Sequence, residues 1–272
     1  MNGDYESIVG GYRELSEAEQ SASVEATARW WDGGAEEYYR DHGATLGDAE
    51  LHWCPEGLRE SQARLLGDVA GRDVVEFGAG AAQGSRYLHG LGARVTATDI
   101  SSGMLAQARA LNRAAGIDFP LLVADARCIP LPDACADVCF TAHGGIAFVP
   151  DPVRIHAEAA RLLRPGGLWV CSLPHPVRWM FPDVPTQAGL TVTRSYFSNE
   201  PYVERTESGR IVYAEYHRTL SQHVADVLSA GLVIEAIDEP TWQAGDLEWN
   251  GWSRLRGELM PGTLIITARK PA

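Results

Sequence analysis

Short apolar runs alternate with amphipathic stretches from residue 73 to the C-terminus. The runs are rich in Val, Ile, Leu and Cys, and most end at a polar residue or a glycine, which is typical of buried strands. The stretches between them often begin at Ser or Pro and stop at Gly, as helices do. This alternation predicts an α/β protein with a parallel, doubly wound sheet. The predicted strands are residues 73–77, 94–98, 120–124, 137–142, 168–173, 232–237 and 263–270.

Residues 1–54 carry helical patterns instead of strand patterns. A capping box of the form Ser-x-x-Glu starts at Ser16, and helices are predicted at 23–31 and 35–41. Flat side chains are dense in this segment, and such side chains suit a lid over a ring-shaped ligand. We therefore expect an N-terminal helical lid over 1–54.

The rest of the chain, 55–272, is expected to be a cofactor-binding domain that starts with a helix over 55–66. Prolines and aromatic residues crowd 174–214, which predicts a substrate-cover insertion before a helix at 215–229. Aromatic residues of the lid, the insertion and a later tryptophan-rich loop favour a flat or hydrophobic substrate. The candidate substrate-binding residues are Tyr39, Trp53, Trp179, Tyr196 and Trp242.

Composition narrows the classes of function. A formal charge of −13 and a pI near 5.0 argue against nucleic-acid binding, which needs clustered basic side chains. Lys270 is the only lysine, which disfavours lysine-dependent phosphate loops and Schiff bases. The five cysteines lack metal-binding spacing, so no metal is expected. Without a membrane-spanning run or a signal-peptide pattern, we expect a cytoplasmic protein with a small-molecule partner and no membrane, and a homodimer stays open.

Acidic residues stand at the ends of successive predicted strands. Ligands of an open parallel sheet bind beyond the carboxyl ends of its strands, so these residues define a candidate site. Gly78 and Gly80 form a tight turn after the first strand, and Glu76 lies just before it. Asp99 ends the second strand, at the separation that brings an acid to ribose hydroxyls, and Asp125 ends the third, where it can accept from an adenine amino group.

The glycine turn discriminates between two adenosine cofactors. The dinucleotide fingerprint Gly-x-Gly-x-x-Gly requires glycine at position 83, but the residue there is Gln83 and the glycine follows at Gly84. Glu76 would repel a pyrophosphate, whereas it favours a ligand with an ammonium or sulfonium centre. The sequence therefore favours S-adenosylmethionine (SAM) over NAD.

These residues resemble the first motif of the class I SAM-dependent methyltransferases, Glu/Asp-x-Gly-x-Gly-x-Gly, with Ala82 in place of the third glycine. The resemblance covers roughly 55–175 and includes Leu-Leu-Arg-Pro-Gly-Gly at 162–167. The sequence is similar to the small-molecule, ubiquinone-biosynthesis-like branch of this family, and to an actinobacterial group with Trp-Trp-Asp near its start. It implies an α/β, Rossmann-like doubly wound, mostly parallel seven-stranded sheet with an antiparallel last strand.

The resemblance also implies roles for single residues. Gly78 and Gly80 would pass under the methionine part, Asp99 would bind the ribose, and Ile100 and Met104 would pack on the adenine. Asp125 with Ala126 would be the adenine-binding pair. The full set of candidate cofactor-binding residues is Glu76, Gly78, Ala79, Gly80, Asp99, Ile100, Met104, Asp125, Ala126 and His143.

Two histidines end later strands, and both are candidate catalytic bases. His143 and His175 have the chemistry to deprotonate a hydroxyl or to hold an amine neutral. The function expected is methyl transfer from SAM to an O, N or C atom of a small aromatic or hydrophobic metabolite, such as an indole, phenol or natural-product scaffold of secondary metabolism. The alternatives are a nicotinamide-dependent oxidoreductase and a SAM-binding protein without catalysis.

Overall fold

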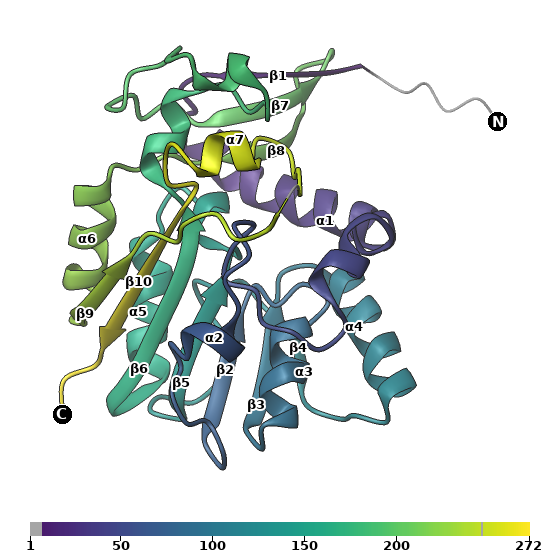
Figure 1. Ribbon diagram of the computed structural model, residues 1–272, viewed down its shortest axis with the longest axis vertical. Coiled ribbons are helices and arrows are strands. Elements are labelled where there is room, and N and C mark those ends of the chain that lie inside the picture. Colours follow the sequence, from purple (N-terminus) through teal and green to yellow (C-terminus); the bar gives the residue numbers. More distant parts are fainter. Residues whose placement is uncertain (1–6, 246) are drawn as a thin grey trace.

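The computed structural model describes residues 7–245 and 247–272. Its centre is a seven-stranded sheet of order β4-β3-β2-β5-β6-β10-β9 (Figure 1). Strands β4, β3, β2, β5 and β6 run parallel to one another, whereas β10 is antiparallel to both β6 and β9. The predicted fold class is confirmed, including the antiparallel last strand. The strands are β2 (Asp73–Phe77), β3 (Arg94–Asp99), β4 (Leu121–Val123), β5 (Ala136–Ala142), β6 (Leu163–Pro174), β9 (Val233–Asp238) and β10 (Thr263–Arg269).

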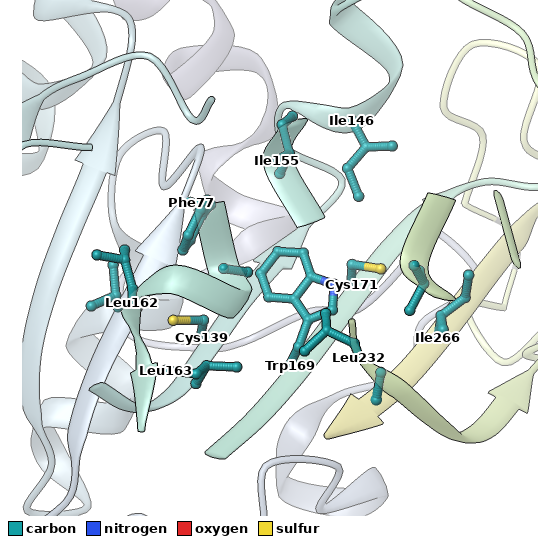
Figure 2. Packing of buried hydrophobic residues seen from close by; sticks show 14 of the residues in the cluster. Phe77, Cys139, Ile146, Ile155, Leu162, Leu163, Trp169, Cys171, Leu232 and Ile266 are labelled. Atoms are coloured by element: carbon teal, nitrogen blue, oxygen red, sulfur yellow. The ribbon is translucent and has the colours of Figure 1, made fainter. Parts of the chain in front are cut away.

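Apolar side chains cover both faces of this sheet. On one face, Trp169 of β6 is fully buried, and Ile155 and Leu162 of the neighbouring helix α5 pack around it (Figure 2). On the other face, Leu88 of α3 packs with Val74 of β2. Burial on both faces explains why the strands read as continuous apolar runs. The helices that flank the sheet are α3 (Gln83–Gly90), α4 (Ser102–Ala115), α5 (Val153–Leu162) and α6 (Leu220–Ser229).

A second, smaller sheet covers one end of the molecule, at the top of Figure 1. It consists of β1 (Ile8–Tyr12), β7 (Tyr202–Thr206) and β8 (Ile211–Glu215), in the order β1-β7-β8. The long helix α1 (Glu17–Leu46) packs against β8 and α4. The predicted division into a helical lid and an insertion needs correction, because β1 of the lid pairs with β7 of the insertion. The two segments form one cover, of which residues 1–6 lie outside the described part.

The short elements lie around the cover and the strand ends. They are α2 (Glu60–Ala63), α7 (Arg254–Gly257) and the 3₁₀ helices η1 (Ile146–Phe148), η2 (Pro176–Met180) and η3 (Gln187–Leu190). Position 246 of the predicted tryptophan-rich loop lies outside the described residues. No helix of the described residues combines the length and the apolar character needed to cross a membrane.

A contact between α1 and α4 holds the cover to the central domain. The Asp32 carboxylate of α1 accepts hydrogen bonds from Ser101 Oγ (2.8 Å) and from the Gly103 N–H (2.8 Å) at the start of α4. A Cβ atom at Gly103 would lie 2.6 Å from the Asp32 carbonyl oxygen, so only glycine allows this approach. These contacts attach the cover at the start of α4, just after the loop that follows β3.

Four predicted helices differ from the observed ones. The capping box at Ser16 is present, but it starts one continuous helix, α1, instead of two short ones. The helix predicted over 55–66 is wrong: Glu60 accepts from the Leu66 N–H (2.9 Å) and holds the chain in a turn, leaving only α2. The helix predicted over 215–229 begins later, because Thr219 caps it and β8 occupies the preceding residues.

Candidate functional site

The glycine turn lies between β2 and α3 and has a left-handed backbone. Gly78 and Gly80 have φ of +64° and +54°, values that favour glycine. A Cβ atom at Gly78 would lie 3.0 Å from Gly144 Cα, so the turn passes close to the loop after β5. Ala82, which stands where the family motif has its third glycine, has φ of +58° and precedes the first residue of α3. The left-handed conformation needed at this position explains why glycine suits it best.

Asp99 holds the turn from the end of β3. Its Oδ2 accepts from the Gly80 N–H (2.7 Å), and its Oδ1 accepts from the Ser101 N–H (2.8 Å). Burial raises the pKa of Asp99, and these backbone hydrogen bonds oppose the rise. Each carboxylate oxygen keeps a second lone pair, so Asp99 is able to accept hydroxyl protons from a ligand while it orients the turn.

Glu76 is buried at the end of β2. Its Oε2 accepts from both the N–H (2.9 Å) and the Oγ (2.5 Å) of Ser85 in α3. Burial raises the pKa of Glu76 to about 7, while the Ser85 hydrogen bonds and the charge of Arg86 act in the opposite direction. Among the described residues, none donates a hydrogen bond to Glu76 Oε1. This oxygen is therefore available to a cationic ligand.

Asp125 is already paired. Arg127 donates to both of its carboxylate oxygens, with Nη2 to Oδ2 at 2.7 Å, and also contacts Asp151 (2.8 Å). Burial favours a higher pKa for Asp125, but the Arg127 hydrogen bonds outweigh it and lower the pKa. An adenine amino group would share this carboxylate with Arg127, and the adjacent Ala126 lines the same space.

His143 follows β5 with φ of +54° and is held by a relay of hydrogen bonds. Thr263 Oγ1 donates its single proton to Glu56 Oε2 (2.8 Å) and lies 3.3 Å from His143 Nε2. With that proton directed to Glu56, Thr263 Oγ1 accepts from the His143 Nε2–H, and none of the described residues donates to Nδ1, which keeps its lone pair. Burial, aided by the charge of Arg178, lowers the pKa of His143 to about 4. The imidazole is neutral near pH 7 and is able to accept a proton.

His175 does not share this site, and its predicted catalytic role is corrected. Its Nδ1 accepts from the Val177 N–H (3.1 Å), and its Nε2 contacts Glu239 Oε1 (2.8 Å). The side chain is buried and does not line the cavity described next. With both ring nitrogens engaged, His175 caps η2 and has a structural role.

One cavity of about 890 Å³ joins these groups, near the upper limit for ligand pockets and large enough for a cofactor and a second molecule. All ten candidate cofactor-binding residues line it. Aromatic rings continue the lining from the cofactor end: Trp31 lies 5.3 Å from Tyr38 and 5.9 Å from Phe148, and Phe148 lies 5.9 Å from Tyr213. The aromatic lining residues are Trp30, Trp31, Tyr38, Phe148, Tyr213, Trp249 and Trp252.

None of the five predicted substrate-binding aromatics lines the cavity. Trp53 is fully buried, with its Nε1 donating to Glu60 (2.8 Å), and Trp179 packs on Tyr12. The remaining three use their polar atoms elsewhere: the Tyr39 hydroxyl donates to Asp48, the Tyr196 hydroxyl accepts from the Leu220 N–H, and the Trp242 Nε1 donates to the Gly245 carbonyl. The segments that carry these five residues reach the cavity through other side chains.

The helical period of α1 identifies its lining residues. Trp31, Tyr38 and His42 are separated by seven and four positions and share one face of a helix, whereas Tyr39 is turned away by one residue. Further cavity residues carry no sequence motif and follow only from the folded cover, among them Arg178 and Glu215.

The sheet order, the glycine turn and the strand-end acids define a protein that binds an adenosine cofactor at the carboxyl edge of a doubly wound sheet. The family model "Methyltransferase domain" matches residues 75–171. A demethylmenaquinone methyltransferase of Mycolicibacterium paratuberculosis is 31% identical over 202 residues, covering 72% of this chain and 83% of that protein. The chain belongs to the family of SAM-dependent methyltransferases.

Other similarities agree with this assignment. A demethylmenaquinone methyltransferase of Tropheryma whipplei is 34% identical over 135 residues, and the match spans 49% of this chain and about half (53%) of that protein's length. A SAM-dependent methyltransferase structure from Mesorhizobium loti superposes with a TM-score of 0.61 at 27% identity, covering 77% of this chain and 96% of that one. A 1,6-didemethyltoxoflavin-N1-methyltransferase from Burkholderia thailandensis, at 18% identity, shares the fold with a TM-score of 0.60 and covers 99% and 97% of the two chains.

The residues present fit SAM. Apart from Gly80 and its two chain neighbours, no described residue has an atom within 4 Å of the position of a Cβ at Gly80, so the turn leaves space for a ligand against its backbone. Glu76 and Asp99 place carboxylate oxygens along this space, which suits a cofactor with a positive sulfonium and an ammonium group. Among the described residues, no group of three or more His, Cys, Asp or Glu side chains has the arrangement of a metal site.

Proposed function

We propose that the protein transfers the methyl group of SAM to a small, flat acceptor bound in the same cavity. The observation that carries the proposal is the continuity of one cavity from the glycine turn and the strand-end acids, past His143, to an aromatic wall. A cofactor held at the first end would have its methyl group directed toward a molecule at the second. The names of the similar proteins, demethylmenaquinone methyltransferase among them, also support a small organic acceptor.

The cofactor end would act through position and charge. SAM supplies a methyl group on a sulfonium, which moves to the acceptor by in-line displacement. Asp99 would accept the ribose hydroxyl protons, and Glu76 would face the ammonium group. Ile100 and Met104 would cover the adenine, with Asp125 and Ala126 at its edge. These contacts fix the direction of the methyl group, which is the main requirement of a displacement reaction.

His143 would remove the proton that the acceptor loses. Its Nδ1 has a free lone pair, and its pKa of about 4 keeps the ring neutral at physiological pH. Thr263 and Glu56 would fix the tautomer together. The Thr263 hydroxyl donates to Glu56, and its oxygen accepts from the His143 Nε2–H. A hydroxyl or amine acceptor would give its proton to Nδ1 as its oxygen or nitrogen takes the methyl group.

The aromatic wall would exclude water and hold a flat acceptor. Trp30, Trp31, Phe148 and Tyr213 form linked ring pairs, and Trp252 lies opposite His143 with 6.0 Å between ring centres. Rings of this kind bind conjugated molecules with little loss of conformational entropy. A natural-product scaffold fits this proposal, and the methylated atom is the one that reaches His143.

Two measurements test the proposal. Isothermal titration with S-adenosylhomocysteine (SAH) and with NAD is expected to give binding of SAH only; binding of NAD without SAH would replace it with a nicotinamide-dependent oxidoreductase. Incubation with methyl-tritiated SAM and small-molecule extracts is expected to label a product, and His143→Gln should abolish most labelling while SAH still binds. SAH binding with no transfer from any extract would favour a non-catalytic SAM-binding protein.

A further inference from the structure

Two side chains of opposite charge reach the cavity from its cover without pairing with each other. Arg178 comes from η2 and Glu215 from the end of β8, and both line the cavity. In the described part of the chain, Arg178 forms its ion pair with Asp183, and no Arg178 nitrogen lies within 4.0 Å of a Glu215 oxygen. A gap between opposite charges in a largely apolar space is unfavourable unless a third group fills it.

Arg178 keeps hydrogen-bond donors free. Its guanidinium lies over the Trp252 ring, 3.9 Å from the ring centre, and its Nη2 donates to Asp183 Oδ1 (2.5 Å). Its Nε is buried, and neither Nε nor Nη1 has an acceptor among the described residues. The buried Nε is out of reach of a ligand in the cavity, whereas stacking on Trp252 fixes the plane of the group and gives the Nη1 donors a defined direction. An Nη1–H is suited to a carbonyl oxygen held beside the indole.

Glu215 offers the complementary group. Its Oε1 accepts a hydrogen bond from the Tyr213 hydroxyl, and no described residue donates to Oε2. The Tyr213 ring packs against Trp30 (5.1 Å between centres) and Phe148, which ties Glu215 to the aromatic wall. Burial raises the pKa of Glu215, and the Arg178 charge opposes this rise. The free oxygen is an acceptor for an N–H or O–H group.

We propose that Arg178 and Glu215 select a neutral, conjugated acceptor in which a carbonyl oxygen lies beside an N–H or O–H group, as in a lactam. The carbonyl accepts from Arg178, the N–H or O–H donates to Glu215, and the rings lie between Trp252 and the aromatic wall. This inference rests on the proposed function, because it describes the acceptor of the same cavity.

Other acceptor classes satisfy fewer of these groups. An anion would meet the carboxylates of Glu215 and Asp183, and a cation would meet the Arg178 guanidinium. A plain hydrocarbon would cover both charged groups and leave their free hydrogen-bonding atoms without partners, at a cost in binding free energy. Only a ligand that both donates and accepts matches the pair. The acceptor is therefore more polar than the tryptophan content of the sequence suggests.

A set of three small probes tests the inference on the SAH-saturated protein by isothermal titration. 2-Quinolone has the carbonyl and the N–H, N-methyl-2-quinolone lacks the N–H, and indole lacks the carbonyl. We expect 2-quinolone to bind about tenfold or more tightly than either of the other two, because each loses a charge-assisted hydrogen bond. Glu215→Ala should remove the difference between the two quinolones, and Arg178→Met the difference between 2-quinolone and indole.

Glu204→Ala is the matched control. Tyr202 and Glu204 form a tyrosine–glutamate pair on the same sheet, opposite Glu215 and Tyr213 in register, but neither lines the cavity. Glu204→Ala should bind the three probes with the same relative affinities as the wild-type protein. If Arg178→Met does not fold, Arg178→Lys replaces it. The difference in affinity between 2-quinolone and indole should then shrink, because lysine lacks the planar guanidinium group and its stacking on Trp252.

The outcomes separate this inference from the function on which it rests. Unchanged probe preferences in Glu215→Ala and Arg178→Met, with SAH binding intact, overturn the inference. The same holds if none of the three probes binds the SAH complex. Loss of SAH binding by the wild-type protein would instead overturn the proposed function.

Discussion

Glu76 is expected to make cofactor binding depend on pH. Its carboxyl is buried beside the glycine turn, and burial raises its pKa to about 7, so about half of the ligand-free protein carries a neutral Glu76 at that pH. The ammonium group of SAH favours the ionised carboxylate. We therefore expect SAH binding to release a proton from Glu76 near neutral pH.

The size of the effect follows from the two pKa values. If the ligand returns the carboxyl to its ordinary pKa of 4.5, the affinity for SAH falls about twentyfold between pH 7.5 and pH 5.5. The sign is fixed because the ionised form binds the cation, so affinity rises with pH and levels off above the pKa of the free protein. The raised pKa of Glu76 also affects the free energy of unfolding. Its stabilising contribution is fully present below the pKa that the carboxyl has in the unfolded chain, and it is lost as the pH rises through about 7.

Isothermal titration at several pH values, in two buffers of different ionisation enthalpy, measures both the affinity and the proton released. Glu76→Gln should bind SAH more weakly at pH 7.5 and should show neither the pH dependence nor the proton release. Asp226→Asn is the control, because Asp226 is also a carboxylate of raised pKa but lies outside the cavity. A wild-type affinity that stays flat over this pH range, without proton release, would refute the reasoning.

Three further predictions concern single contacts. Asp99→Asn should weaken SAH by about 1.5 to 3 kcal/mol, since an amide loses charge-assisted bonds to the ribose; unchanged affinity by titration would remove Asp99 from the site. His143→Gln should lower kcat about a hundredfold, and wild-type kcat should not respond to His143 ionisation above about pH 5, because its pKa is about 4; a rate profile that rises through pH 6.5 contradicts this. Trp53→Phe should lower the free energy of unfolding by about 1 to 3 kcal/mol in urea titrations, because Glu60 loses a buried donor, and should leave acceptor KM unchanged; a KM change alone would return Trp53 to the acceptor site.

The part of the site that the central sheet forms could be predicted from the sequence. Gly78, Asp99 and Asp125 follow predicted strands, and a parallel sheet places all its carboxyl ends at one edge, so a one-dimensional pattern fixes their neighbourhood. His175 also follows a predicted strand, yet it does not line the cavity. A strand end does not fix where a ring points, and the Val177 N–H and Glu239 turn that imidazole away from the cavity.

The acceptor end was not accessible in the same way. Its residues come from α1, η1, η2, β8 and the loop before α7, which meet only because β1 pairs with β7 and α1 packs on β8. No local sequence pattern indicates that two strands so far apart in the chain, β1 and β7, pair with each other. Even within one helix, the choice between Tyr38 and Tyr39 depends on which face of α1 turns inward.

The contact between Asp32 and Gly103 has a consequence for how related sequences are able to diverge. Because a Cβ at position 103 would lie 2.6 Å from the Asp32 carbonyl oxygen, the glycine is required only while α1 lies this close to α4. A descendant that shifts or loses the first turns of its cover is released from that constraint and is free to acquire any helix-forming residue there. Glycine at this position, together with a carboxylate at position 32, should therefore mark the members of the family that carry this kind of cover.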